Sequence, residues 1–216
     1  MTNSVESRTS DRKPGTRRRA DGEQSRRAIL RAAAELASVE GLEGLSIAAL
    51  ADRVGLSKSG LYAHFGSKEE LQLQTIEAAR EVFAEEVVRP ALAEPPGLPR
   101  LRALAHRFLE HVERGTFPGG CFFASVGAEV DSRPGPLRDR IAAIHRDWSG
   151  QFERCLVEAQ ASRDLESRAD PRQVAFEVMA MLAGAHQSFL LQGDRTALER
   201  AKAGIEVVLE SHSARR

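Results

Sequence analysis

The sequence is poor in the residues and runs that define several large protein classes. It has two cysteines in 216 residues, Cys121 and Cys155, which excludes a disulfide framework and fits a reducing compartment. No apolar run approaches the length that spans a bilayer. The first residues, MTNSVESRTSDRKPGTRRR, lack an apolar segment of the kind found in secretion signals. We therefore expect a cytoplasmic protein with no membrane partner.

The chain also lacks a net charge, because 31 basic residues balance 31 acidic ones. The overall charge therefore gives no sign of a nucleic-acid partner, but the distribution of charge does. Between Arg8 and Arg31, nine Lys and Arg residues stand against three acidic residues. Such a block is typical of a mobile arm that lies along a polyanion, and also of a solvated tail without a partner. We predict a basic, disordered arm over residues 1–20.

Motifs that carry catalysis are missing as well. Gly55 and Gly60 have the spacing of a phosphate-binding loop, but Leu61-Tyr62 stands where such a loop needs Lys followed by Ser or Thr. The sequence has no Gly-x-Ser-x-Gly elbow, no His-Glu-x-x-His and no Cys/His set with metal-ligand spacing. We therefore expect no enzyme, no metal site and no cofactor.

The sequence does contain helical periodicity along most of its length. Apolar residues recur at three- and four-residue spacing and nowhere alternate for long, which predicts an all-α fold of about nine helices. Ser, Thr and Asp caps and Gly or Pro breaks set the boundaries. The expected helices run from near Asp21 to Gly41–Gly44, Ser46–Val54, Ser57–Phe65, Ser67 to about Val88, Leu98–Arg114, Pro118–Asp131, Pro136–Ala161, Pro171–Gln192 and Thr196–Ser211.

Two domains are expected after the arm. Residues 21–66 contain three helices with a three-residue turn between the second and third, which is the shape of a helix-turn-helix unit. Residues 67–216 form a larger helical domain. Its proline-rich stretch PALAEPPGLPR, which begins at Pro90, predicts a break between packed pieces rather than a long flexible linker.

The stretch GLSKSGLYAHF, residues 55–65, is unusual for a helix. A turn of about 100° per residue places Leu61 and Phe65 on one side as apolar anchors. The opposite side is small, which allows close approach of the backbone, and its edges carry donors that suit phosphate oxygens. A small stripe also suits packing on another protein helix, but these polar edges fit that contact poorly. The outward residues are Lys58, Ser59, Gly60, Tyr62, Ala63 and His64.

The segment LSIAALADRVGLSKSGLYAHFGSKEEL, Leu45 to Leu71, resembles the DNA-binding segment of the tetracycline-repressor (TetR/AcrR) family of bacterial transcriptional regulators. The matching features are a Ser opening the second helix, an Ala-x-x-x-Gly turn, Ser-Lys, Leu-Tyr-x-x-Phe, and Ser-Lys-Glu-Glu-Leu. The rest of the chain agrees in helix number and length. The resemblance implies a sequence-specific regulator of transcription, a ligand-responsive repressor that binds double-stranded DNA at a palindromic operator as a homodimer.

The resemblance also implies roles for individual residues. Ser46, Tyr62 and Lys68 occupy phosphate-contacting positions, and Lys58 and Ser59 lie where family members approach bases and backbone. One departure is Gly60, which stands where many members have Thr or Ser, so the base preference should differ. The expected DNA-binding residues are Ser46, Ser57, Lys58, Ser59, Gly60, Tyr62, His64 and Lys68.

The last two predicted helices are candidates for a dimer contact. The helix Pro171–Gln192 is apolar on nearly every side, which indicates burial on both sides. Such helices either complete the core of one chain or pair across a two-fold axis. In the family they form a four-helix contact between subunits. The resemblance therefore favours an interface of Val178, Met181, Leu182, Ala185, Phe189, Leu198, Ala201, Ile205 and Val208.

The stretch from Leu98 to Phe152 has the composition of a cavity for a small molecule. Apolar walls with a few polar groups suit such a site, and they also suit an ordinary helical core. In the family an effector binds in this region, so we expect an unidentified small-molecule effector. Cys121 fits a buried structural thiol better than a redox sensor, because no cationic neighbour is evident. The candidate ligand-binding residues are Phe108, His111, Phe117, Cys121, Phe122, Trp148 and Phe152, with Phe123, His106 and His145 nearby.

One other class of function stays open from the residues alone. It is a small-molecule or protein-binding dimer that keeps the helix-turn-helix shape without sequence-specific DNA recognition. The zero net charge mildly favours this class, whereas the basic N-terminal block and the pair Tyr62 and Lys68 favour DNA. Only a DNA-binding regulator should lose affinity for DNA steeply as salt rises.

Overall fold

The computed structural model describes the backbone of residues 14–214 and the side chains from residue 22 to residue 214. The described residues form no strand, as predicted. They form nine separate helical segments when the continuous run of α4, the π-helix η1 and α5 is counted as one. The elements are α1 (Pro14–Gly44), α2 (Ile47–Val54), α3 (Lys58–Phe65), α4 (Lys68–Phe83), η1 (Ala84–Val88), α5 (Arg89–Leu92), α6 (Leu98–Arg114), α7 (Phe122–Val130), α8 (Pro136–Ala161), α9 (Pro171–Gln192) and α10 (Thr196–Ser211).

The first helix begins earlier than predicted. It starts at Pro14 instead of near Asp21, so the part of the predicted disordered arm from Pro14 to Ala20 is helical, while residues 1–13 lie outside the described residues. Proline is well suited to a first helical turn, and the arginines after it are good helix formers. At the other end, Gly41 leaves the helical conformation (φ 78°, ψ 168°) and kinks α1 before it ends.

Two further boundaries differ from the sequence prediction. The helical rod of α4 continues through Pro90 to Leu92, because the π-helical turn just before this proline changes the local hydrogen-bond partners. The helix predicted from Pro118 begins only at Phe122. Gly120 has a positive φ of 83°, which lies outside the helical region, and α7 begins after it.

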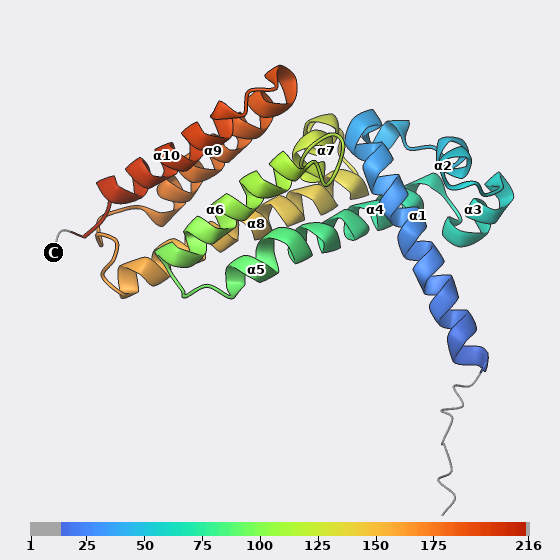
Figure 1. The fold of residues 1–216 in the computed structure, drawn as a ribbon, viewed down its shortest axis with the longest axis horizontal. Coiled ribbons are helices and arrows are strands. Elements are labelled where there is room, and N and C mark those ends of the chain that lie inside the picture. The colour runs from blue at the N-terminus through green and yellow to red at the C-terminus, as the bar shows by residue number, and fades with distance from the viewer. Residues whose placement is uncertain (1–13, 215–216) are drawn as a thin grey trace, which may run out of the picture.

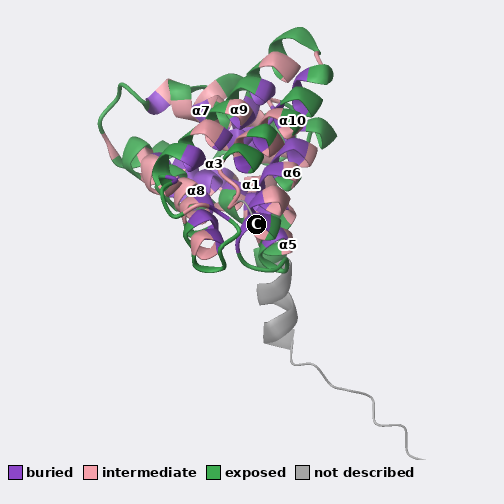
Figure 2. Ribbon diagram, turned by 90° about the vertical axis from the view of Figure 1, so that its left-hand side faces the viewer, coloured by how far each residue is buried: buried purple, intermediate pink, exposed green. Residues whose placement is uncertain are grey.

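The helices form an elongated molecule with two hydrophobic cores. In Figure 1 the helix-turn-helix lies at the right and the α9–α10 hairpin at the left, with the rod of α4 to α5 running between them along α6 and α8. The first core joins Leu45, Leu61 and Ile76 to Phe117 and Phe122, which come from the C-terminal part. The second core lies among the end of α4, α6, α8, α9 and α10. Buried residues follow the inward sides of these helices (Figure 2).

The helix α9 contradicts one sequence expectation. By length and composition it is apolar enough to cross a membrane, although only 33% of the relevant window is buried within the chain. This helix was not singled out from the sequence, because isolated polar residues such as Glu177 and His186 interrupt its apolar pattern. In the structure α9 packs along α10 and against α8 and α6.

Candidate DNA-binding surface and effector cavity

Two serines cap the helices of the helix-turn-helix. The Ser46 Oγ accepts a hydrogen bond from the Ala49 amide at 3.1 Å, and the Ser57 Oγ accepts one from the Gly60 amide at 3.1 Å. Between them, Gly55 adopts the left-handed conformation (φ 67°) that closes α2. These caps fix where α3 begins, and therefore which of its residues face outward.

The helix α3 has the two faces that the sequence predicts. Leu61 and Phe65 are buried in the first core. Tyr62 is 55% exposed, and Lys58, Ser59 and His64 are also exposed on the outer side. Within the described part of the chain, Lys58 forms no ion pair. The outer face of α3 thus presents a cation, hydroxyl groups and an imidazole, the groups that bind phosphates and base edges.

Lys68 is already engaged in a contact. Its Nζ donates to the Glu43 carbonyl oxygen at 2.7 Å and lies 3.2 Å from Glu43 Oε2. Because both side chains are largely exposed, water and salt screen this pair strongly. A phosphate that contacts Lys68 must therefore compete with Glu43.

Arg26, one of the basic residues near the N-terminus, supports α3, a role that its place in the sequence did not predict. The Arg26 guanidinium on α1 donates to the His64 carbonyl at 3.1 Å and lies 5.2 Å from the centre of the Phe65 ring. The same side chain donates to the amide oxygen of Gln74 on α4. Arg26 thereby links α1, α3 and α4 and helps to fix the angle of α3.

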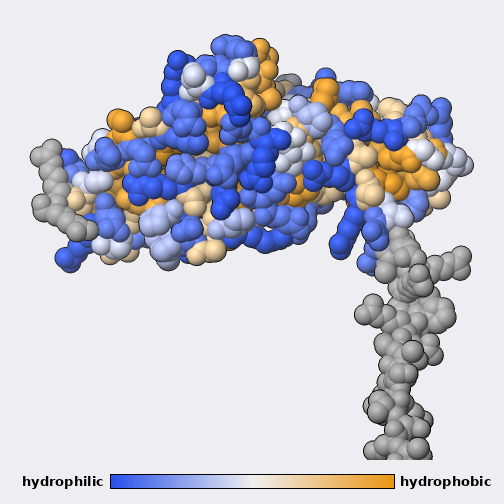
Figure 3. All heavy atoms as spheres, viewed as in Figure 1, coloured by the Kyte–Doolittle hydropathy of each residue, from blue (hydrophilic) through white to orange (hydrophobic). Residues whose placement is uncertain are grey.

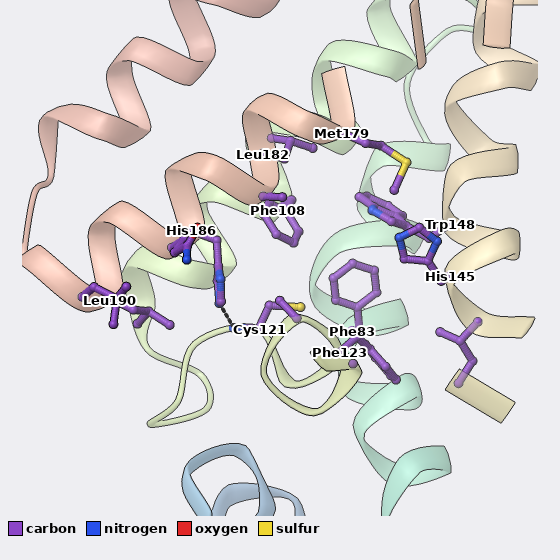
Figure 4. Close-up of a pocket in the computed structure, with 16 residues that line it drawn as sticks. Phe83, Phe108, Cys121, Phe123, His145, Trp148, Met179, Leu182, His186 and Leu190 are labelled. Carbon is purple, nitrogen blue, oxygen red and sulfur yellow. Dashed lines mark hydrogen bonds between the residues drawn. The ribbon is translucent and has the colours of Figure 1, made fainter. Parts of the chain in front are cut away.

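The C-terminal part contains a cavity of about 560 Å³. Its walls come from α4, α6, α7, α8 and α9 and from the turn before α7 (Figure 4). The lining residues are Phe83, Phe108, Cys121, Phe123, Ala124, Gly127, Ile144, His145, Trp148, Met179, Leu182, Ala183, His186, Gln187, Leu190 and Leu191.

The structure brings only some of the predicted ligand-binding residues to this cavity. Phe108, Cys121 and Trp148 line it, together with Phe123 and His145. The other four candidates do not line it, because their side chains fill the cores or pair elsewhere: His111, Phe117, Phe122 and Phe152. The sequence reading missed Phe83 and the whole contribution of α9. A lone histidine, His186, on an otherwise apolar helix was the available signal.

Aromatic rings form one wall of the cavity. Phe83 lies at its centre, with ring centroids 5.0 Å from Trp148 and 5.9 Å from Phe123, both edge to face. Phe108 lies 6.1 Å from Trp148 with a 29° angle between their planes. These rings contact one another, so each limits the movement of its neighbours and together they form an apolar wall.

Cys121 and His186 contribute a hydrogen-bonded pair to the cavity lining, which also includes the polar residues His145 and Gln187. The Cys121 amide donates a hydrogen bond to His186 Nε2 at 3.0 Å (Figure 4). This bond places the remaining imidazole proton on Nδ1. Burial lowers the pKa of His186 below its ordinary 6.5, and the nearby His111 lowers it further. Burial raises the pKa of the Cys121 thiol, so both groups stay uncharged near neutral pH.

The loop before α7 connects this cavity to α1. At one end Cys121 is bonded to His186, and two residues earlier the Gly119 amide donates to Ser38 Oγ on α1 at 3.1 Å. The contact is close: a Cβ on Gly119 would lie 1.8 Å from the Ser38 carbonyl oxygen. The loop is therefore packed rigidly between a cavity-lining helix and the helix that carries the DNA-binding unit.

A second connection runs through η1. Glu86 accepts hydrogen bonds from Thr116 Oγ1 at 2.6 Å and from the His111 ring, whose Nδ1 lies at 2.8 Å. The Thr116 carbonyl in turn accepts one from Arg31 on α1 at 3.2 Å. Burial disfavours the Glu86 carboxylate, but the hydrogen bonds from Thr116 and His111 outweigh it and lower its pKa. The cavity residue Phe83 precedes this π-helical turn directly.

Most of the predicted dimer residues are buried within the single chain. Six of the nine are buried in the core of the single chain, although Ala185 and Ala201 also line a shallow surface groove: Val178, Leu182, Ala185, Leu198, Ala201 and Ile205. Met181, Phe189 and Val208 are half-buried and pack against the same core. Because α9 is apolar on nearly every side, the sequence pattern does not separate its core side from its exposed side. The apolar residues that remain exposed there include Phe176 (68%), Leu191 (75%) and, on α10, Val207 (65%).

These features define an all-helical protein with a helix-turn-helix at one end and a ligand-sized cavity in a separate helical region. Residues 29–75 match the family described as bacterial regulatory proteins, tetR family, and residues 97–205 match the tetracyclin repressor-like C-terminal domain. The chain belongs to the tetracycline-repressor family of transcriptional regulators.

Individual relatives and solved structures agree with this assignment. The chain is 27% identical to the HTH-type transcriptional regulator TcmR of Streptomyces glaucescens, over 97% of this chain and 92% of TcmR. It is 30% identical to the nucleoid occlusion factor SlmA of Vibrio campbellii, over 76% of this chain and 83% of SlmA.

Two solved structures are similar over most of the chain. A TetR transcriptional regulator from Chloroflexus aurantiacus has a TM-score of 0.83 at 25% identity, covering 90% of this chain and 98% of that one. AibR, in complex with isovaleryl coenzyme A and operator DNA, has a TM-score of 0.69 at 26% identity, covering 85% and 97%. Proteins of this family are DNA-binding repressors with ligand-binding C-terminal domains, typically homodimers on palindromic operators, and they are not enzymes.

Proposed function

We propose that this regulator is a repressor whose α3 enters the major groove and whose cavity binds the effector that releases DNA. The observation that supports the proposal most directly is the outer face of α3. Its exposed Lys58, Ser59 and Tyr62 stand opposite the buried anchors Leu61 and Phe65. In this arrangement Lys58 and Ser59 contact bases and backbone, and Tyr62 contacts phosphate.

The remaining DNA-binding candidates take supporting roles in the proposal. Ser46 and Ser57 use their hydroxyls as helix caps, so they position α2 and α3 on the backbone. Gly60 allows close approach of α3, and His64 borders its edge. Lys68 binds phosphate after leaving Glu43, which makes part of its contribution dependent on salt.

The proposed dimer contact uses the exposed side of α9 and α10. Phe176, Ala180, Gly184 and Leu191 share one side of α9 and are exposed in the single chain, as is Val207 on α10. In Figure 3 hydrophobic atoms also reach the surface near the tip of this hairpin. Burial against a second copy removes this apolar area from water and accounts for the membrane-like composition of α9 in a cytoplasmic protein.

The proposed mechanism links the cavity to α3 by two routes. A ligand that occupies the cavity contacts Phe83, which shares the rod of α4 with Lys68. It also contacts His186, which holds the loop that packs on Ser38 of α1. Movement of either wall changes the spacing of the two recognition helices in the dimer. Linkage then requires effector and DNA to weaken each other by the same factor.

Selection of bound sequences from a random duplex library tests the DNA-binding part of the proposal. The wild type is expected to enrich one palindromic sequence, because a two-fold dimer reads two equal half-sites. Tyr62→Ala should lose the enrichment, whereas Val39→Ala, at an exposed apolar position on α1, should keep it. No enrichment at low or moderate salt would favour instead the binding dimer without sequence-specific recognition.

The similarity to SlmA supports a second candidate role, in nucleoid occlusion. The ligand-sized cavity and the end-to-end match to TcmR favour the ligand-responsive regulator. Deletion of the gene separates the two roles. If the protein is a nucleoid occlusion factor, its deletion should allow division septa to form across the chromosome. If it is a repressor, its deletion should leave division normal and raise the transcript level of a gene beside its operator.

A further inference from the structure

The walls of the cavity carry no strong charge. Among its lining residues there is no Lys, Arg, Asp or Glu; the titratable groups are Cys121, His145 and His186. Cys121 and His186 stay uncharged, as described above, and His145 is exposed at the edge of the cavity. An ionised group on a ligand would therefore lose its water without gaining a charged partner in the interior, which is unfavourable.

The cavity also offers a specific set of apolar and polar contacts. Phe83, Phe108, Phe123 and Trp148 form an aromatic wall, and Met179 and Leu182 extend the apolar surface from α9 (Figure 4). Aromatic faces bind flat rings by offset or edge-to-face packing. His186 also lines the cavity and carries its proton on Nδ1, for which no partner occurs among the described residues, and we assign this N–H to a ligand oxygen.

We propose that the effector is an uncharged, planar, polycyclic aromatic molecule that carries a carbonyl or hydroxyl oxygen. A cavity of about 560 Å³ falls in the range for drug-sized ligands, which corresponds to roughly two to four fused rings. This inference rests on the proposed function and narrows its ligand. It differs from the ligand of AibR, since phosphates of a coenzyme A thioester call for Lys or Arg side chains, which this cavity lacks.

The protein contains its own reporter of binding, because Trp148 is the single tryptophan of the chain and lines the cavity. We would titrate the full-length protein with matched pairs: anthraquinone against anthraquinone-2-carboxylate, and 9-anthracenemethanol against anthracene-9-carboxylate. Isovaleryl coenzyme A serves as the charged comparison. The neutral member of each pair is expected to change Trp148 fluorescence saturably and to bind about tenfold more tightly than its carboxylate. Equilibrium dialysis confirms one site per chain.

A charge-introducing variant tests the same inference in the opposite direction. Leu190 lines the cavity and is 39% exposed, so Leu190→Lys adds a cation at the edge without burying it. This variant is expected to raise the affinity for the carboxylates and to narrow the difference within each pair. Leu92→Lys, at a similarly exposed leucine (43%) outside the cavity, should leave both affinities unchanged.

The outcomes separate this inference from the proposed function. Tighter binding of a carboxylate or of isovaleryl coenzyme A to the wild type, or no saturable binding of any neutral aromatic, would overturn the effector class. If a neutral aromatic binds the cavity without changing the affinity for the selected duplex, the proposed ligand class is correct but the ligand-responsive function is wrong. If a charged ligand releases the duplex, the ligand-responsive function is correct but the proposed effector class is wrong.

Discussion

The imidazole of His186 on α9 accepts a hydrogen bond from the amide of Cys121 at 3.0 Å, in the turn that leads into α7. A cavity-lining side chain thus holds the backbone of a loop whose other end packs on Ser38 of α1. Both partners are buried, so the bond is not exchanged easily for water. The geometry makes this bond a structural link between the two parts of the molecule.

Removing the acceptor should destabilise the protein. In His186→Leu the Cys121 amide is left buried without a partner, which costs about 1–3 kcal/mol of unfolding free energy. His186→Gln keeps an acceptor oxygen within reach and should cost less. Urea unfolding followed by circular dichroism measures both variants. Equal losses for Leu and Gln would mean that ring packing, and not the hydrogen bond, supplies the stability.

Stability should fall as the solution becomes acidic. Burial lowers the pKa values of His186 and His111 below their ordinary 6.5, so between the folded pKa and 6.5 the unfolded chain binds more protons. The contribution of these neutral histidines to the free energy of unfolding is therefore complete above pH 6.5, and it decreases as the pH falls below 6.5.

The matching measurement compares urea midpoints at two pH values. The wild-type midpoint should be lower at pH 5.5 than at pH 7.5, and His186→Gln should show a smaller difference. Glu86, whose pKa is also lowered, adds its own loss only below its ordinary 4.5. Identical midpoints at the two pH values would show that the histidines are not buried in their neutral form.

A methyl group on Gly119 should disturb the loop that connects cavity and α1. Its Cβ would lie 1.8 Å from the Ser38 carbonyl oxygen, so the loop or α1 must shift. We expect Gly119→Ala to lower the free energy of unfolding by about 1–3 kcal/mol and to weaken binding to the selected duplex. Gly150→Ala is the control, because only the flexible Arg154 side chain lies near it. A fully stable Gly119→Ala protein that binds DNA normally would contradict the close contact.

The proposed dimer face predicts which charges break the dimer. Leu191→Glu places a carboxylate in the proposed contact on α9, and the expected result is a monomer by sedimentation or light scattering. Val39→Glu, at an equally apolar position that is 65% exposed on α1, should remain a dimer. The predicted interface residues that lie in the core are unsuitable for this test, because a charge there would unfold the chain. A dimeric Leu191→Glu would move the interface elsewhere.

The pair of Lys68 and Glu43 predicts a gain of DNA affinity on removing an acid. Glu43→Gln frees Lys68 from its carboxylate partner, so binding of the selected duplex should tighten several-fold at low salt, on the order of 1 kcal/mol. Glu40→Gln removes an exposed acid of the same helix that forms no ion pair within the described residues. Equal effects of both substitutions would indicate a general charge effect rather than release of Lys68.

The parts that the sequence predicted correctly depend on local signals. The two faces of α3 follow from helical periodicity and the Ser57 cap, and both are present in the structure. Most helix boundaries follow from caps, prolines and glycines. The start of α7 was missed because Gly120 takes its conformation in a turn packed between α1 and α9, which no local pattern reveals.

The cavity and the exposed side of α9 were harder to predict because they depend on contacts between distant segments. Phe83 and His186 are about a hundred residues apart in the chain, and only the packing of α4 against the rest brings them to one cavity. The side of α9 that is free for a partner is also set by packing, since α6, α8 and α10 cover the other sides. An apolar pattern on every side cannot identify that free side.

Reciprocal titration of effector and DNA shows whether the cavity controls DNA binding. The affinity of the tightest neutral aromatic of the panel is measured by Trp148 fluorescence, with and without a saturating amount of the selected duplex. The affinity for the duplex is then measured with and without that compound. We predict that each ligand weakens the other by the same factor, at least about fivefold. Unchanged affinity of DNA-bound protein for the compound would contradict the claim that this cavity controls DNA binding.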